Sequence, residues 1–387
     1  MKTTKPADAG LDPARLGRLT SAIKDDIARE RYDGAVFIVA RGGKVAMHEA
    51  IGFTDRKSGR VARTDDVFLI FSITKALTAA AVLIRIDRGE LSLTTKVADV
   101  IPEFGRKGKH RVTIAQLMSH TAGMSAGLPP VPMELLGDQE AMVAAICQMG
   151  IEAIPGEKVS YSPIVAHSIL AEVVRRVDGG RRPFREILAA DVFKPLDMSD
   201  TALGLRRDLA PRKVPVVVRD RSEGMFPPEM LEAFNTIVNE DSEIPAAGAF
   251  STTSDLFLFT EALRRGSAPE SARILSPAII RMATTNHTGT RRNSLWDYAL
   301  EMRGWDEFPA FLGLTFFLRG TGVFPHWFGN LSSPGTFGAV GAGSTLFWVD
   351  PERDLTFVCL TAGLLEETHS VDRFQRLSDL VSSAVTS

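Results

Sequence analysis

Residues 68–84 read FLIFSITKALTAAAVLI, an apolar run that contains a single serine, Ser72, and a single lysine, Lys75. The alanine-rich part after Lys75 predicts a helix. If this helix begins near Ser72, the serine and the lysine lie about one turn apart on the same face. The free N–H groups of a helix N-terminus favour negative charge. A hydroxyl, an amine and such a helix end in apolar surroundings are the parts of a nucleophile centre.

The same spacing recurs at Ser21 and Lys24, so the spacing alone does not identify a site. That second pair lies within residues 13–31, whose apolar residues predict a plain amphipathic helix with both polar side chains on its solvated face. At Ser72 the neighbours are apolar on both sides, and a lysine is costly to bury without a function. The context therefore favours Ser72 and Lys75 as the candidates.

The composition is that of an ordinary globular protein. The chain has 387 residues, 44% of them hydrophobic and 24% charged, with a net charge of −2. This balance indicates neither a nucleic-acid-binding surface nor a disordered acidic tail. The N-terminal residues lack the apolar core of a signal peptide, and no run is long enough to span a bilayer. Cys147 and Cys359 lie in apolar segments, which predicts buried free thiols. We expect a cytoplasmic protein without disulfides, membrane contact or nucleic-acid partner.

Strand patterns occur near both ends of the chain, and helical patterns lie between them. Residues 35–53 predict an antiparallel hairpin around Gly42-Gly43, and the last strands join at Asp350-Pro351. The other predicted strands lie at 298–302, 313–318, 344–349 and 355–361, before a final helix. We expect an α+β fold, an α/β sandwich, in which helices flank an antiparallel sheet built from both termini. The expected domains are a discontinuous sheet domain (1–71 and 241–387) and a mainly helical domain (72–240), with the active site between them.

Other catalytic signatures lack the context that they need. A G-x-S-x-G pattern spans 123–127, but a helix rather than a strand is expected before it. The histidines show no zinc-type spacing, and no glycine-rich phosphate loop follows a strand. The sequence therefore predicts neither a metal nor a cofactor.

Five segments stand out in order along the chain: residues 71–75 (FSITK), 116–124 (QLMSHTAGM), Tyr161-Ser162, 245–252 (PAAGAFST) and 337–344 (FGAVGAGS). Taken in this order, they resemble the serine β-lactamase superfamily. The resemblance extends over about residues 12–384 and is greatest to the class C-like branch, which includes family VIII carboxylesterases and related acyl transferases.

The resemblance implies a role for each matching residue. Ser72 corresponds to the acylated nucleophile, and Lys75 to the lysine that helps to deprotonate it. Tyr161 corresponds to the tyrosine that relays protons and protonates the leaving group. The backbone N–H groups of Ser72 and Ala342 would form the oxyanion hole. The physical reasoning agrees, because apolar surroundings lower the pKa of a lysine, and small residues permit a close approach to a backbone donor.

The chain departs from the family pattern at two positions. Pro163 stands where many β-lactamases have asparagine, and Ala339 stands where the third motif normally begins with lysine, histidine or tryptophan. Matching triplets at 57–59 and 287–289 are interpreted as chance because of their positions. Without a cation at residue 339, the usual anchor for a β-lactam or peptide carboxylate is missing. This favours an uncharged ester substrate.

The remaining substrate-binding candidates are Ala339 and Gly341 in the third motif, and His326 and Trp327 in an aromatic segment. The last two are expected either to line the acyl or alcohol pocket or to pack in a surface loop. The leading hypothesis is a serine carboxylesterase that acts on small or medium esters through an acyl-Ser72 intermediate. The alternatives are an acyl transferase that uses an alcohol acceptor and a non-catalytic binding protein. The sequence gives neither the natural ester nor the oligomeric state.

Overall fold

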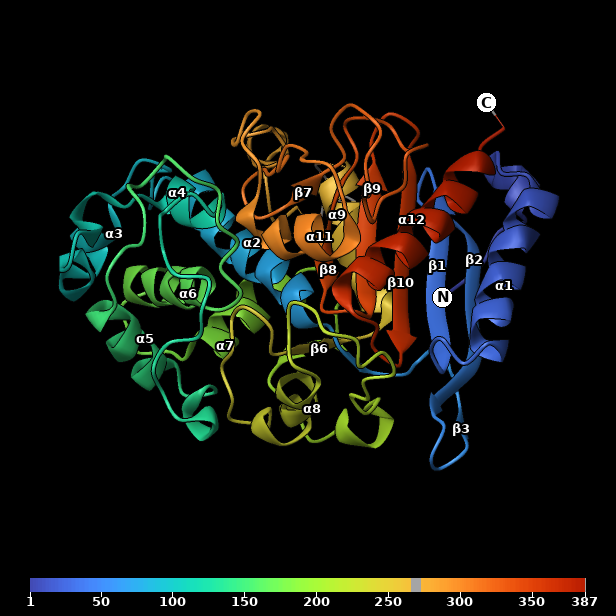
Figure 1. Ribbon diagram of the computed structural model, residues 1–387, viewed down its shortest axis with the longest axis horizontal. Helices are drawn as coiled ribbons and strands as arrows, with labels where there is room; N and C mark the ends of the chain where they lie inside the picture. The colour runs from blue at the N-terminus through green and yellow to red at the C-terminus, as the bar shows by residue number, and fades with distance from the viewer. Residues whose placement is uncertain (266–272, 387) are drawn as a thin grey trace.

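The computed structural model describes residues 1–265 and 273–386. Its main feature is an antiparallel sheet with the strand order β3-β2-β1-β10-β9-β8-β7, so that strands from the two ends of the chain meet at the β1–β10 pair (Figure 1). This confirms the predicted α+β class and the sheet built from both termini. The strands are β1 (Gly34–Arg41), β2 (Lys44–Asp55), β3 (Arg60–Val61), β7 (Phe317–Leu318), β8 (Phe337–Gly341), β9 (Thr345–Asp350) and β10 (Leu355–Ala362).

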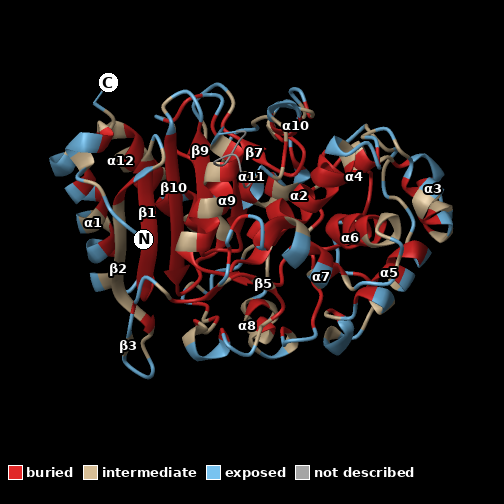
Figure 2. Cartoon of the chain, turned by 180° about the vertical axis from the view of Figure 1, so that it is seen from behind, coloured by how far each residue is buried: buried red, intermediate tan, exposed pale blue. Residues whose placement is uncertain are grey.

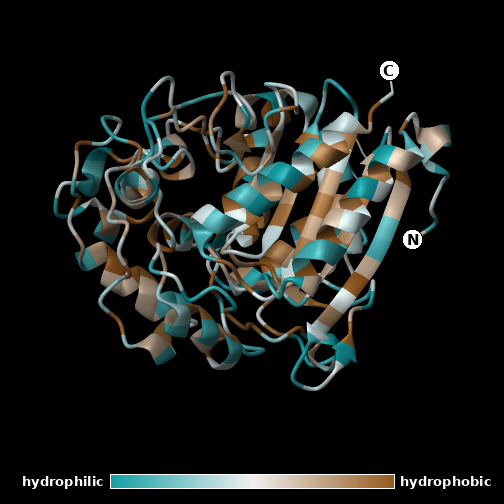
Figure 3. Ribbon diagram, turned by 45° about the vertical axis from the view of Figure 1, so that its right-hand side comes forward, coloured by the Kyte–Doolittle hydropathy of each residue, from teal (hydrophilic) through white to brown (hydrophobic). Residues whose placement is uncertain are grey.

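Two helices from opposite ends of the chain cover one face of the sheet. They are α1 (Pro13–Ala28) and α12 (Glu367–Ser383), which pack against each other and against apolar side chains of the sheet. Hydrophilic residues lie along the outward side of the helices on this face (Figure 3). Asp12 caps α1 by accepting hydrogen bonds from two backbone N–H groups, and Pro13 occupies the first turn.

The opposite face of the sheet is covered by α9 (Thr253–Arg265) and by the helical region of the chain. The central strands β1, β9 and β10 are therefore buried almost throughout (Figure 2). The remaining helices are α3 (Val97–Val100), α4 (Ile114–Met118), α5 (Gln139–Gln148), α6 (Val165–Val177), α7 (Phe184–Leu188), α8 (Pro228–Ile237), α10 (Pro277–Ala283) and α11 (Asp297–Arg303).

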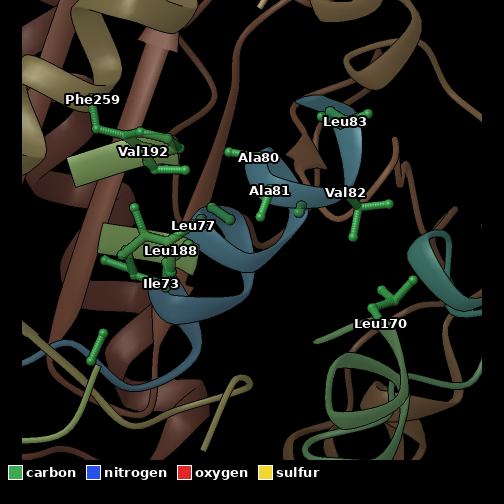
Figure 4. Packing of buried hydrophobic residues seen from close by; sticks show 14 of the residues in the cluster. Ile73, Leu77, Ala80, Ala81, Val82, Leu83, Leu170, Leu188, Val192 and Phe259 are labelled. Atoms are coloured by element: carbon green, nitrogen blue, oxygen red, sulfur yellow. The ribbon is translucent and has the colours of Figure 1, made fainter. Parts of the chain in front are cut away.

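Helix α2 (Thr74–Asp87) passes through the middle of the molecule. Its residues from Thr74 to Arg85 are buried on every side, which suits a helix rich in alanine and leucine. Ile73 and Leu77 face the segment that carries Leu188 and Val192, while Leu170 of α6 lies beyond the other side (Figure 4). The sheet side and the helical side thus share one core around the element that carries the candidate nucleophile. The domain boundaries at residues 72 and 240 stay a prediction.

A second, small sheet fixes the start of α2. It has the strand order β4-β6-β5, with β4 (Phe68–Leu69), β5 (Ala202–Leu203) and β6 (Ala249–Ser251). Because β6 lies in the middle, this sheet joins the segment before Ser72 to a segment about 180 residues later.

Two local predictions need correction. Residues 298–302 were expected as a strand but lie in α11, which ends at Gly304 in the left-handed conformation that glycine favours. The strand expected at 313–318 is reduced to the two residues of β7. The segment 206–240, which the sequence did not resolve, contains α8. None of the described helices combines the length and the apolar character that crossing a membrane requires.

Candidate active site

A strained turn presents Ser72 between the two sheets. Phe71 has a φ of 45°, a left-handed conformation that is costly for a bulky residue and persists only when its surroundings fix it. Ile70 supplies that restraint: its N–H donates to the Ala249 carbonyl, and its own carbonyl accepts a 3.0 Å hydrogen bond from Thr345 Oγ1. The turn is thus held from both sheets, and Ser72 is half-buried at the start of the helix.

Lys75 lies next to Ser72, as the one-turn spacing predicts. Its Nζ is 2.9 Å from Ser72 Oγ and donates a 3.0 Å hydrogen bond to the Ala246 carbonyl. The side chain is 2% exposed, and none of the ion pairs among the described residues includes it. Burial holds the pKa of Lys75 well below its ordinary value of 10.5. The amine is therefore suited to be neutral and to take the proton of Ser72.

Tyr161 completes the group from the loop before α6. Its ring centroid is 5.0 Å from Lys75 Nζ, and it lines the same cavity as Ser72. Burial raises the pKa of Tyr161 above its ordinary value of 10.0. A buried phenol of this kind stays protonated at neutral pH, so it can donate a proton while the neutral lysine accepts one.

Two buried histidines, which sequence patterns did not single out, lie next to this group. The His120 ring is 4.6 Å from the Tyr161 ring and 5.6 Å from the His167 ring. His120 Nδ1 accepts a hydrogen bond from the Ser162 N–H, which fixes the loop that carries Tyr161. Burial, with Lys75 nearby, lowers the pKa of His120 to about 3 and lowers that of His167 in the same direction. Both rings are therefore neutral supports.

His120 should make the protein sensitive to mild acid. The unfolded state takes up this proton near pH 6.5, whereas the folded state resists it down to about pH 3, so stability is complete above pH 6.5 and is lost as the pH falls. Between pH 6.5 and 5 this amounts to about 2 kcal/mol. Between pH 7 and pH 5, we expect the free energy of unfolding of His120→Asn to fall by about 2 kcal/mol less than that of the wild type. Asparagine suits the left-handed backbone at this position. Urea unfolding of both proteins at the two pH values tests this, and equal losses would contradict it.

Ser72 and Ala342, the two residues expected to supply the oxyanion N–H groups, line the same two cavities. None of the backbone hydrogen bonds of the described residues uses either donor. Gly341 brings Ala342 close to the nucleophile, because a Cβ on Gly341 would lie 2.3 Å from the Ile70 carbonyl oxygen. A pair of unoccupied donors beside a serine is what an oxyanion hole requires.

Two cavities meet at Ser72. The first, here the apolar cavity, has a volume of about 210 Å³ and an apolar lining that includes Phe71, Leu136, Ile164, Leu231, Phe234 and Ile244. The second, here the aromatic cavity, is lined by Tyr161, Phe226, Phe317, Trp327, Val340 and Glu367, among others. Ser72, Ala342, Met225 and Phe226 belong to both. A ligand bound across the serine would therefore have one part in each cavity.

The substrate-binding candidates lie in different places. Trp327 lines the aromatic cavity. Ala339 points into the core between the sheet and the helices, and its neighbour Val340 faces the aromatic cavity instead. His326 packs edge-on against Phe328, accepts the Phe328 N–H at Nδ1 and lines neither cavity. Gly341 contributes close backbone packing, as described above.

Glu367 and Phe226 also line the site, and the sequence did not single them out. Phe226 lies in the segment whose structure the sequence did not resolve, and Glu367 begins the last helix. In the sequence, Glu367 is visible as a carboxylate that follows an apolar strand. This does not identify a site residue, because acidic residues are common in the first turn of a helix, where they stabilise the helix.

Comparison with known proteins gives a consistent result. Esterase EstB from Burkholderia gladioli is 33% identical over 213 residues, which cover 50% of this chain and 53% of EstB. Esterase/beta-lactamase LipL from Mycobacterium tuberculosis is 28% identical over 380 residues, which cover 92% of this chain and 82% of LipL. A solved family VIII carboxylesterase structure superposes with a TM-score of 0.76 over 96% of this chain and 99% of that chain, and at 23% identity this similarity concerns the fold.

The family comparison decides the classification. The Beta-lactamase family model matches residues 19–380, a range that includes Ser72, Lys75, Tyr161 and Ala342. The match covers nearly the whole chain and confirms the resemblance drawn from the ordered motifs. The chain belongs to the beta-lactamase family.

Proposed function

We propose that this protein is a serine hydrolase that cleaves small or medium carboxylic esters through an acyl-Ser72 intermediate. The observation that carries the proposal is the contact of Ser72 with a buried lysine that has no counterion among the described residues, beside two backbone donors that none of these residues occupies. Relatives named as esterases support the hydrolytic class. A binding protein that had lost catalysis would have no need to keep this costly lysine in place.

In the first step, Lys75 takes the Ser72 hydroxyl proton while Oγ forms a bond to the ester carbonyl carbon. The oxyanion is held by the N–H groups of Ser72 and Ala342. Collapse of the intermediate breaks the ester C–O bond. The departing alkoxide receives a proton from Tyr161, which recovers it from the Lys75 ammonium. Water then attacks the acyl-enzyme through the same groups, releases the carboxylic acid and regenerates Ser72.

The two cavities have different parts in this scheme. Tyr161 lines the aromatic cavity and not the apolar cavity, so the leaving alcohol belongs on the aromatic side. The acyl group then occupies the apolar cavity. Its volume of about 210 Å³ lies below the roughly 300–1,000 Å³ of pockets for drug-sized ligands, which favours short and medium acyl chains.

Neutral esters should be hydrolysed far faster than β-lactams. No cation stands at residue 339 to hold a β-lactam carboxylate, and the Glu367 carboxyl lines the cavity instead. We expect kcat/KM for p-nitrophenyl butyrate to exceed that for nitrocefin by at least about 100-fold, the scale of losing a charge-assisted contact and meeting a like charge.

The experiment is a panel of p-nitrophenyl esters of increasing acyl length, with nitrocefin assayed beside them. A maximum at short or medium chains supports the proposal. Nitrocefin turnover comparable with ester turnover would show that the missing cation matters little. Repeating the best ester with added alcohol acceptors separates hydrolysis from acyl transfer, because a transferase would release mainly the new ester.

A further inference from the structure

Glu367 places a carboxylate beside the oxyanion donors. It is the first residue of α12, and its Oε1 accepts a 3.0 Å hydrogen bond from the N–H of Gly343, the residue after Ala342. The side chain is partly buried and lines the aromatic cavity together with Ser72. Its position is therefore fixed by the same turn that positions the oxyanion hole.

Several aromatic rings line the aromatic cavity, together with the non-aromatic side chains of Met225, Leu295, Val340 and Ala342. Phe317 connects two of the rings: its ring lies 6.0 Å from the Tyr161 ring in a stacked arrangement and 5.0 Å from the Trp327 ring in an edge-on arrangement. Phe226 contributes a further ring from the segment before α8. Aromatic faces attract cations, and several rings around one space form the kind of cage that binds quaternary ammonium groups. The cavity has a volume of only about 20 Å³, so a group of that size enters when the side chains around it move apart.

The Glu367 carboxylate has no cationic partner among the residues that the structure describes. Arg373, six residues along the same helix, instead donates to Thr361 and to the Gly343 carbonyl. Glu366 is held separately by Tyr298 and Arg303. Burial raises the pKa of Glu367 to about 7, and Glu366 adds to this effect while Arg373 opposes it. A cation entering the cavity would supply the missing counterion.

We infer that the aromatic cavity binds an alkylammonium group carried by the alcohol half of the ester. The Glu367 carboxylate acts as its counterion, and the rings of Phe226, Phe317 and Trp327 surround it. The inference rests on the proposed function, since Tyr161 assigns this cavity to the leaving alcohol. The inferred substrate is therefore a cation, whereas a cation in the third motif would hold a substrate that carries a carboxylate.

The test compares two esters of the same shape. Choline butyrate carries a quaternary nitrogen where 3,3-dimethylbutyl butyrate carries carbon. At pH 8, where Glu367 is ionised, we expect wild-type kcat/KM to favour choline butyrate by about tenfold. In Glu367→Gln, which can still accept the Gly343 N–H, the ratio of the two values should fall to near one. Glu366→Gln, which removes the same charge one residue away, should keep the ratio.

A wild-type ratio near one, or a preference that Glu367→Gln leaves unchanged, would overturn the inference. Binding is tested separately by calorimetric titration of tetramethylammonium chloride into Ser72→Ala and into Ser72→Ala/Glu367→Gln, with sodium chloride as the ionic control. Binding that is about tenfold weaker in the double variant supports the cavity assignment even if no ester is hydrolysed, in which case the proposed function alone fails. Equal binding, or none to Ser72→Ala, contradicts the assignment.

Discussion

Ser72→Ala is expected to lower kcat for p-nitrophenyl butyrate by at least about 10⁴-fold, as the loss of a nucleophile does in other serine hydrolases. The substitution removes the oxygen that forms the acyl bond and that lies 2.9 Å from Lys75 Nζ. It leaves the backbone N–H donors in place, so ester binding should persist with a similar KM. Steady-state kinetics with an active-site titration of the wild type measures the change.

Lys75→Met is the matched variant, because methionine fills a similar volume without the amine. We expect a loss of the same order in kcat, since no other base is in contact with Ser72 in the described part of the chain. Full activity in either variant would contradict the assignment of the nucleophile and its base. Thermal unfolding of both variants provides the control for folding.

Gly341→Ala should be the second most damaging change, although it adds only a methyl group. Its Cβ would lie 2.2 Å from Thr345 Oγ1 and 2.3 Å from the Ile70 carbonyl oxygen, so β8 and the nucleophile turn would have to separate. That movement displaces the Ala342 donor from the Ser72 donor. Loss of one oxyanion donor costs about 10²–10³-fold in kcat, and we expect an effect of this size.

Gly335→Ala offers the matched control on the approach to the same strand. Gly335 is exposed, and the nearest atom to its Cβ would be the end of the flexible Glu352 side chain at 3.1 Å, with Pro351 Cγ at an ordinary contact distance of 3.9 Å. This variant should retain wild-type kcat. If Gly341→Ala were as active as Gly335→Ala, the proposed role of the β8 contact in placing the oxyanion hole would be wrong.

Much of the fold follows from local sequence. The paired β patterns around Gly42-Gly43 and Asp350-Pro351 predict the two hairpins that form the middle of the sheet, because turn residues and alternation act over short distances. Residues 298–302 show the limit of this approach. Five residues can suit a strand or a helix, and the outcome depends on how the ends are capped, here by a 3-10 turn before α11 and by Gly304 after it.

The active site, too, could be predicted from local sequence only in part. The spacing of Ser72 and Lys75 is local, so their contact could be predicted. The aromatic cavity gathers Phe226, Phe317 and Glu367 from distant segments, and no local pattern indicates that they meet. Ala339 shows a subtler limit: neighbouring strand residues point to opposite faces, so a motif position alone does not tell which side chain faces the site.

The central claim is that Ser72 carries the acyl group during turnover. We would mix the enzyme with p-nitrophenyl butyrate, quench it in acid within the first turnover, and measure the intact mass and the mass of the digested peptides. The account predicts that the protein gains one butyryl group on Ser72, and that Ser72→Ala gains none. A butyryl group on another residue, or turnover in the wild type without any acylated protein, would contradict it.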